Sequence, residues 1–85
     1  MHEMSLALEI GRIAEERAGD AVGQVVTVGV EVGDGAGVEP ENLAFCLEAV
    51  LATPPFRRAR PVLERRAGDG LRLLYLEVDD ERPDD

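Results

Sequence analysis

The first three residues, Met1-His2-Glu3, are the stretch whose residue types and spacing could do chemistry. His2 is the only histidine of the chain and lies one peptide bond from the Met1 amine. That amine, the His2 amide nitrogen and the His2 imidazole can close adjacent chelate rings around one ion, and the Glu3 amide or carboxylate could supply a fourth ligand. Nitrogen-rich, square-planar coordination suits Ni(II) or Cu(II) rather than zinc. Because such nitrogens lose protons when they bind, the affinity should fall as the pH falls.

The rest of the chain offers little other chemistry. Its single cysteine, Cys46, excludes an internal disulfide and a cysteine-based zinc cage, so no zinc is expected. The glycine-rich segment 33–37 is followed by no Lys-Ser/Thr and lacks the glycine spacing of a dinucleotide-binding loop. No histidine remains to activate a nucleophile, and so small a chain has little room for a catalytic pocket. The sequence therefore gives no basis for an enzyme.

Composition restricts the partners. The 85 residues suffice for one small domain, and their net charge of −9 argues against nonspecific nucleic-acid binding. No apolar run approaches the roughly 20 residues that a membrane span needs. We therefore expect a cytoplasmic protein that binds neither nucleic acid nor membrane.

All nine basic residues are arginines, and six of them fall within residues 56–72, where the net charge is +4. Solvated strand faces and turns are the commoner explanation of such a cluster. The other explanation is contact with an acidic partner, because guanidinium groups match carboxylates well. The candidate partner-binding residues are Arg57, Arg58, Arg60, Arg65 and Arg66.

Apolar spacing predicts two helices. Residues 4–18 carry an apolar stripe at three- and four-residue intervals, and Gly19 is suited to end that helix. A second helix should begin at Glu39-Pro40, since proline fits the first helical position, and end before Thr53. Cys46 is expected to be a small core residue of this second helix.

Three segments, residues 24–32, 60–66 and 71–78, read as strands. Alternation in the first predicts that Val26, Val28, Val30 and Val32 share a buried face. A helical crossover between the first two strands favours a parallel pair. Asp69-Gly70 within the turn 67–70 predicts an antiparallel hairpin of the last two strands, and the very apolar last strand is expected to be central.

These elements predict an α+β fold: a two-layer sandwich with two helices on a three-stranded mixed β-sheet, in the order α-β-α-β-β. Residues 1–78 should form a single domain. The acidic residues 79–85 are expected to be a disordered tail.

Four segments carry a resemblance to a known family. The opening, MHEMSLA at residues 1–7, resembles that of the HypA/HybF family of hydrogenase-maturation nickel chaperones. VGVEVG at residues 28–33 resembles the first strand of that family, GVEPENLAF at 37–45 its entry into the second helix, and LRLLYLEV at 71–78 its closing strand. These segments are spread over most of the chain, from residue 1 to residue 78, in the right order.

The resemblance implies a nickel site at the start of the chain. His2 and Glu3 would bind Ni(II) through side-chain and backbone nitrogens, with the Met1 amine, and the acidic residues Glu39 and Glu41 are additional candidate ligands. The nickel would be held transiently. It would pass to a GTPase accessory protein (HypB-like) and onward to the large subunit of nickel–iron hydrogenase, or to urease in some organisms.

One departure from the family is large. Family members carry a zinc-binding insertion with two Cys-x-x-Cys pairs between the last two strands, where this chain has only residues 67–70. The chain thus resembles the nickel domain alone, which puts in question the dimerisation, pH sensing and hand-over that the zinc module serves. Two functions stay open: a nickel metallochaperone of reduced form, or a metal-free interaction module that kept the scaffold and lost nickel delivery.

Overall fold

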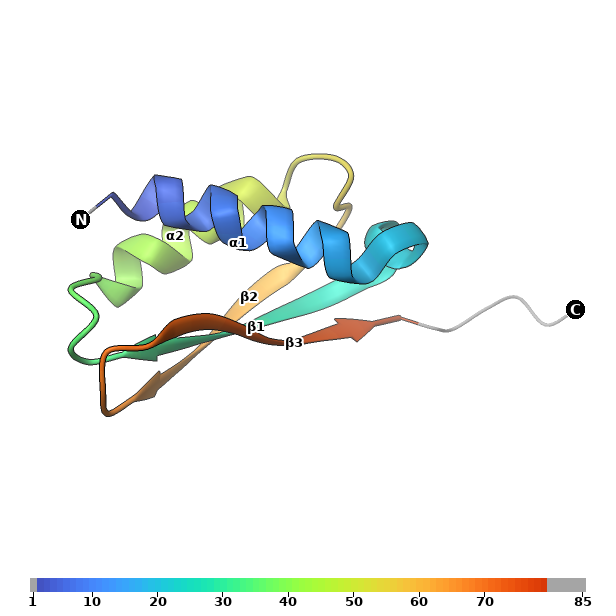
Figure 1. Cartoon of the computed structure of the whole chain (residues 1–85). Coiled ribbons are helices and arrows are strands. Elements are labelled where there is room, and N and C mark those ends of the chain that lie inside the picture. Colours follow the sequence, from blue (N-terminus) through green and yellow to red (C-terminus); the bar gives the residue numbers. More distant parts are fainter. Residues whose placement is uncertain (1, 80–85) are drawn as a thin grey trace, which may run out of the picture.

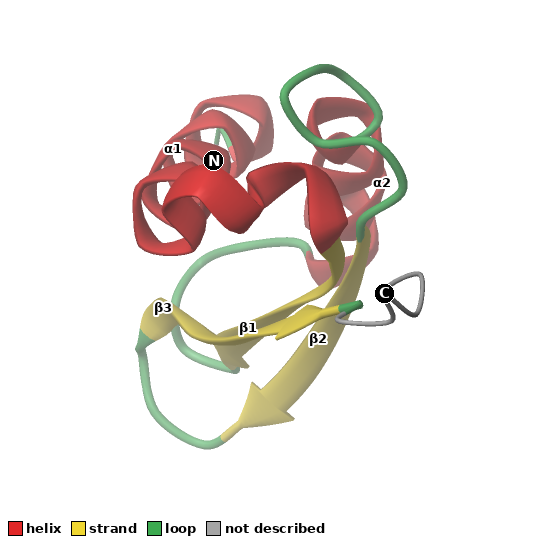
Figure 2. Cartoon of the chain, turned by 90° about the vertical axis from the view of Figure 1, so that its right-hand side faces the viewer, coloured by secondary structure: helices red, strands yellow, loops and turns green. Residues whose placement is uncertain are grey.

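The computed structural model describes residues 2–79, so Met1 and residues 80–85 lie outside the described residues. The elements in chain order are α1 (Glu3–Ala18), the short 3₁₀-helix η1 (Gly19–Gln24), β1 (Val25–Gly33), α2 (Pro40–Leu51), β2 (Arg60–Arg66) and β3 (Leu71–Val78). Both helices lie on one face of the three-stranded sheet (Figures 1 and 2), which confirms the predicted α+β sandwich. Within residues 2–79, no helix is both long and apolar enough to cross a membrane.

Local sequence explains where the helices begin and end. Helix α1 stops where Gly19 takes a positive φ of 56°, a conformation that glycine adopts without steric cost, and the Gly19 N–H donates to the Glu15 carbonyl. Helix α2 begins with Pro40, and the preceding Glu39 accepts a hydrogen bond from the Glu41 N–H through its side chain, at 3.1 Å. The predicted helices are confirmed to within about a residue at each end.

The two helices run in the same direction and pack closely. Glu3 contacts the first turn of α2, and in the last turn of that helix Val50 lies against Gly11 of α1. A Cβ atom at Gly11 would lie 2.8 Å from Val50 Cγ1, so only glycine permits this approach. Cys46 is 7% exposed and belongs to the core, as predicted.

The strand order is β2-β1-β3, with β1 parallel to β2 and antiparallel to β3. The parallel pairing was predicted correctly. The predictions of a central β3 and of a β2–β3 hairpin are wrong, because β1 lies between those two strands. The apolar composition of β3 misled the prediction: Tyr75 and Leu76 of this edge strand are only half-buried.

A β-bulge also changes the buried face of β1. Val25 pairs with Val78 and Thr27 pairs with Glu77, so Val26 is an extra residue in the ladder. As a result Val25 is fully buried while Val26 is only half-buried, and the prediction is corrected at this one valine. Val28, Val30 and Val32 are buried as predicted.

The face of the sheet away from the helices, here called the open face, carries a charged ladder and one aromatic ring. The ring of Tyr75 in β3 lies over Gly29, its partner in β1. A Cβ atom at position 29 would overlap this ring, so the close contact requires a glycine there. Glu31 of β1 lies between Arg66 at 3.9 Å and Arg72 at 3.3 Å, and its side chain is 12% exposed.

Residues 67–70 cross the end of β1 rather than forming a hairpin turn. The Gly33 N–H donates to the Gly70 carbonyl at 2.6 Å, and the Gly35 N–H donates to the Gly68 carbonyl at 2.7 Å. The linker therefore runs over the end of the middle strand to join the two outer ones. A Cβ atom at Gly33 would lie 2.6 Å from the Gly68 oxygen.

Replacing Gly33 by alanine should therefore destabilise the fold by about 1–3 kcal/mol, because the clashing atoms belong to backbone that cannot rotate away. Denaturant unfolding followed by circular dichroism measures the change. Gly23→Ala is the matched control: its nearest neighbour is the flexible Arg57 side chain, at 3.3 Å, so its cost should stay within about 0.5 kcal/mol. Equal stability of the Gly33 variant and the wild type would contradict the close crossing.

Candidate metal site at the start of helix α1

His2 lies immediately before α1, and its side chain is exposed. Its carbonyl oxygen accepts a hydrogen bond from the Leu6 N–H at 3.2 Å, which closes the first turn of the helix. Its side chain, in contrast, makes no capping hydrogen bond. The backbone of His2 is therefore fixed by the helix, while its imidazole takes no part in capping it. Met1, the other predicted ligand of this segment, lies outside the described residues.

Glu3 is the one charged residue among the buried positions of the described chain, at 7% exposure. Its Oε2 atom accepts a hydrogen bond from the Glu39 N–H at 3.0 Å, and its Oε1 atom accepts one from Asn42 Nδ2 at 3.1 Å. We call this arrangement the Glu3 clip. The Glu39 N–H lowers the pKa of the Glu3 carboxyl group, and burial opposes that shift only in part.

The Glu3 clip joins the starts of the two helices. Glu3 is the first residue of α1, and its partners Glu39 and Asn42 lie just before and within the first turn of α2. Backbone N–H groups in a first helical turn have no intrahelical acceptor, so a carboxylate is well placed there. The N–H of Glu3 itself also belongs to a first helical turn. Glu3 thus has a side chain engaged in folding and a backbone nitrogen that the helix does not use.

The two further candidate ligands lie beside this clip. The Glu39 side chain accepts from the Glu41 N–H at 3.1 Å and so caps α2, and both side chains are exposed. Within residues 2–79, no three histidine, cysteine or acidic side chains are gathered closely enough to hold a metal ion.

Sequence reasoning missed Asn42. This residue lies in the first turn of α2 and donates its side-chain amide to Glu3 across 39 positions of the sequence. Its only local signal is a polar residue two positions after the proline that starts the helix. No periodicity or motif links it to Glu3.

The five arginines predicted to contact a partner lie in two groups at opposite ends of β2. Arg60 and Arg66 are the first and last residues of that strand, about 20 Å apart at the usual rise per residue. The group at the start of the strand comprises Arg57, Arg58 and Arg60, of which Arg58 pairs with Asp79. At the other end Arg65 pairs with Asp34 at 3.4 Å, and Arg66 pairs with Glu64 at 2.7 Å.

Comparison with known proteins places this sequence in a family. The model of the family described as "Hydrogenase/urease nickel incorporation, metallochaperone, hypA" matches residues 1–71. The hydrogenase maturation factor HypA of Geobacter metallireducens is 40% identical over 70 residues, covering 82% of this chain and 62% of that protein. HypA of Streptomyces avermitilis is 41% identical over 71 residues, covering 80% of this chain and 53% of the relative. HypA of Albidiferax ferrireducens is 47% identical over 51 residues, covering 59% of this chain and 45% of that protein.

These matches have two limits. The chain spans at most about 62% of the length of these relatives, and no solved structure matches it. The family match also ends at residue 71, so the resemblance of the last strand to the closing strand of the family lies beyond it. The match nevertheless includes the opening residues, both helices and the first two strands. The chain belongs to the HypA family of nickel-incorporation metallochaperones.

Proposed function

We propose that this protein is a nickel carrier for the maturation of nickel–iron hydrogenase, or of urease, and that it holds Ni(II) at Met1-His2-Glu3. The ligands are the Met1 amine, the His2 amide and imidazole nitrogens, and the Glu3 amide nitrogen. One observation carries the proposal. The exposed His2 side chain does not cap α1, and the carboxylate of the next residue, Glu3, is held by hydrogen bonds to the start of α2.

The Glu3 clip favours the amide over the carboxylate as the fourth ligand. Both carboxylate oxygens already accept hydrogen bonds, from Glu39 and Asn42, and the group is buried. Pulling it out to bind nickel would break both hydrogen bonds and leave the part-buried Glu39 N–H without this acceptor, which is costly. The amide nitrogen of Glu3 can be used while both of these hydrogen bonds stay in place. It also continues the series of nitrogens that begins at Met1, which suits square-planar Ni(II).

The position of the site suits a carrier. All four proposed ligands belong to three consecutive residues at one end of a helix, so a receiving protein can approach the ion from outside. A carrier must release its cargo, and protonation of the nitrogens gives it a route to do so. The exposed Glu39 and Glu41 carboxylates lie near the clip, where they can contact the ion during transfer. The proposed receivers are a GTPase accessory protein and the hydrogenase large subunit.

The second candidate is a metal-free interaction module. It is favoured by Arg57 and Arg60, for which the described residues provide no ion pair. The division of the arginines between the two ends of β2 weakens this candidate, because a single acidic surface would have to span both groups. Nickel binding separates the two functions directly.

Titration of Ni(II) into protein with an untagged N-terminus should show binding, and His2→Ala should weaken it by more than about tenfold, because the imidazole is the only side-chain ligand of the proposed set. Isothermal titration calorimetry measures both. An N-terminal tag would be a misleading control, since it removes the free amine. Equal binding by the wild type and the His2 variant, or none by either, would rule out the nickel-carrier proposal.

Glu3→Gln should lower the stability of the fold rather than the nickel affinity. The side-chain amide cannot accept both hydrogen bonds of the clip, so the unfolding midpoint should drop, whereas nickel affinity should stay near that of the wild type because the backbone amide remains. His2→Ala should leave the unfolding midpoint unchanged. A Glu3 variant that folds stably but loses nickel would show instead that the carboxylate is the ligand.

The stability difference between wild type and Glu3→Gln should depend on pH in one direction. Because the folded state lowers the pKa of Glu3, the clip contributes fully above the ordinary glutamate pKa of about 4.3 and is lost as the pH falls through the lower folded value. The two proteins should therefore converge in stability in acid. Thermal unfolding scans between about pH 7 and pH 3 measure this, and a constant difference would argue against an ionised clip.

Elemental analysis of purified protein should find no stoichiometric zinc, since the chain has one cysteine and lacks both Cys-x-x-Cys pairs of the family insertion. Bound zinc at one equivalent would show that another ligand set exists. A sample stripped with a chelator and reloaded with nickel alone is the matched comparison.

A further inference from the structure

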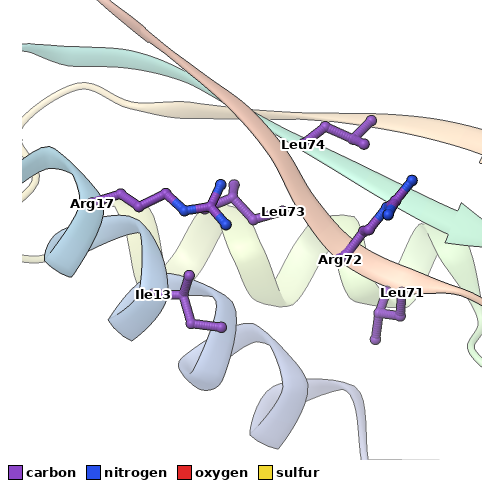
Figure 3. A pocket seen from close by; sticks show the side chains of 6 residues that line it. All are labelled: Ile13, Arg17, Leu71, Arg72, Leu73 and Leu74. Atoms are coloured by element: carbon purple, nitrogen blue, oxygen red, sulfur yellow. The ribbon is translucent and has the colours of Figure 1, made fainter.

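Strand β3 forms one edge of the sheet, and its side away from β1 has no strand partner in the described chain. The strand is eight residues long, and six of them are apolar. A groove of about 390 Å³ runs beside it, between the strand and the last turns of α1, where Ile13 and Arg17 lie (Figure 3). An apolar edge of this length is a template for another strand.

The sequence of β3 is complementary to itself when two copies run antiparallel. It begins Leu71-Arg72 and ends Glu77-Val78, with apolar residues between. If Leu71 of one copy lies opposite Val78 of the other, then Arg72 lies opposite Glu77 at both ends of the paired strands. The remaining cross-strand pairs in this register are apolar.

This register also requires that opposite residues lie on the same face of the sheet. In a regular strand Arg72 and Glu77, an odd number of positions apart, would point to opposite faces. A β-bulge removes this conflict. Gly29 pairs with Tyr75 and Val30 pairs with Leu73, so Leu74 is an extra residue in β3 and the alternation of faces shifts by one position there.

The pairing with β1 shows the result. Arg72 lies opposite Glu31 and Glu77 lies opposite Thr27, so both charged residues of β3 are on the open face. Figure 3 shows Arg72 and Leu74 extending to one side of the strand, away from Leu71.

The apolar residues match in the same way on the face that packs against the helices. Leu73 lies opposite the buried Val30, and Leu76 lies opposite the buried Val28. The register would therefore place Leu73 of one copy beside Leu76 of the other. Val78, which is 40% exposed, would be covered next to Leu71 at the groove.

We propose that two copies of this chain associate through their β3 edges in this antiparallel register, forming one continuous six-stranded sheet. The open face then carries a ladder of alternating charge, in which Arg72 lies between Glu31 of its own chain and Glu77 of the second copy. Arg72 is already held 3.3 Å from Glu31. Glu77 forms no ion pair within the described residues, so the second copy supplies its partner.

Two factors limit the strength of this dimer. Each chain has a net charge of −9, so the copies repel one another at long range. The contact is one strand wide, which puts it at the small end of specific interfaces. The association should therefore be weak and dependent on protein concentration.

Sedimentation equilibrium over a hundredfold range of protein concentration tests the proposal, and the wild type should shift from monomer toward dimer. Arg72→Glu alone makes both charged positions of β3 acidic, and Glu77→Arg alone makes both basic, so each variant should dimerise at least tenfold more weakly. An equimolar mixture of the two should dimerise again, because every cross-strand pair then has opposite charges. The double variant Arg72→Glu/Glu77→Arg should also recover dimerisation.

Arg60→Glu is the matched control, since it reverses one exposed charge on the other edge strand and should leave dimerisation unchanged. Glu77→Arg keeps the contact between Arg72 and Glu31, so its effect can be measured without disturbing the fold, and a thermal melt confirms this. A wild type that stays monomeric at every concentration would overturn the proposal. So would a dimer that is unaffected by the single charge changes, or a mixture of the two variants that remains monomeric.

Discussion

The double pairing of β1 is the constraint on which the rest of the structure depends. This strand hydrogen-bonds to β2 on one side and to β3 on the other, and four of its valines are buried in the core. A middle strand must have both edges filled and its end closed. The linker 67–70 provides that closure by accepting hydrogen bonds from Gly33 and Gly35. The absence of a side chain at Gly33 is thus a condition for joining the two outer strands by so short a connection.

The helices follow from the same constraint. The crossover from β1 to a parallel β2 needs a helix of about the length of α2, and α1 covers the remaining part of the same face. Gly11 lets the two helices approach, and the Glu3 clip fixes their starts next to one another. Of the residues proposed to bind nickel, Glu3 lies directly at this junction. Its position is therefore set by tertiary contacts as well as by helix α1.

Much of this fold could be read from the sequence, and the failures have physical causes. Helix limits were predictable because Gly19 and Pro40 act locally, through backbone conformation. The strand order was not, because Asp69-Gly70 is typical of a hairpin whether or not a third strand lies between the two it joins. The bulge at Val26 could not be predicted either, since an extra residue in the ladder leaves the alternating pattern of valines intact and is detected only by the pairing.

At the candidate site, the sequence predicts which residues could bind nickel but leaves the role of Glu3 open. Its two possible roles, as an amide ligand and as a carboxylate ligand, are equivalent in the sequence. They differ in the structure because Asn42 and the Glu39 N–H occupy the carboxylate. The carboxylate holds α1 against α2, so the proposed binding of nickel through nitrogens at the start of α1 would not loosen the contact between the helices. The proposed carrier would then keep one fold in its loaded and empty states, and a partner could recognise the same surface before and after transfer.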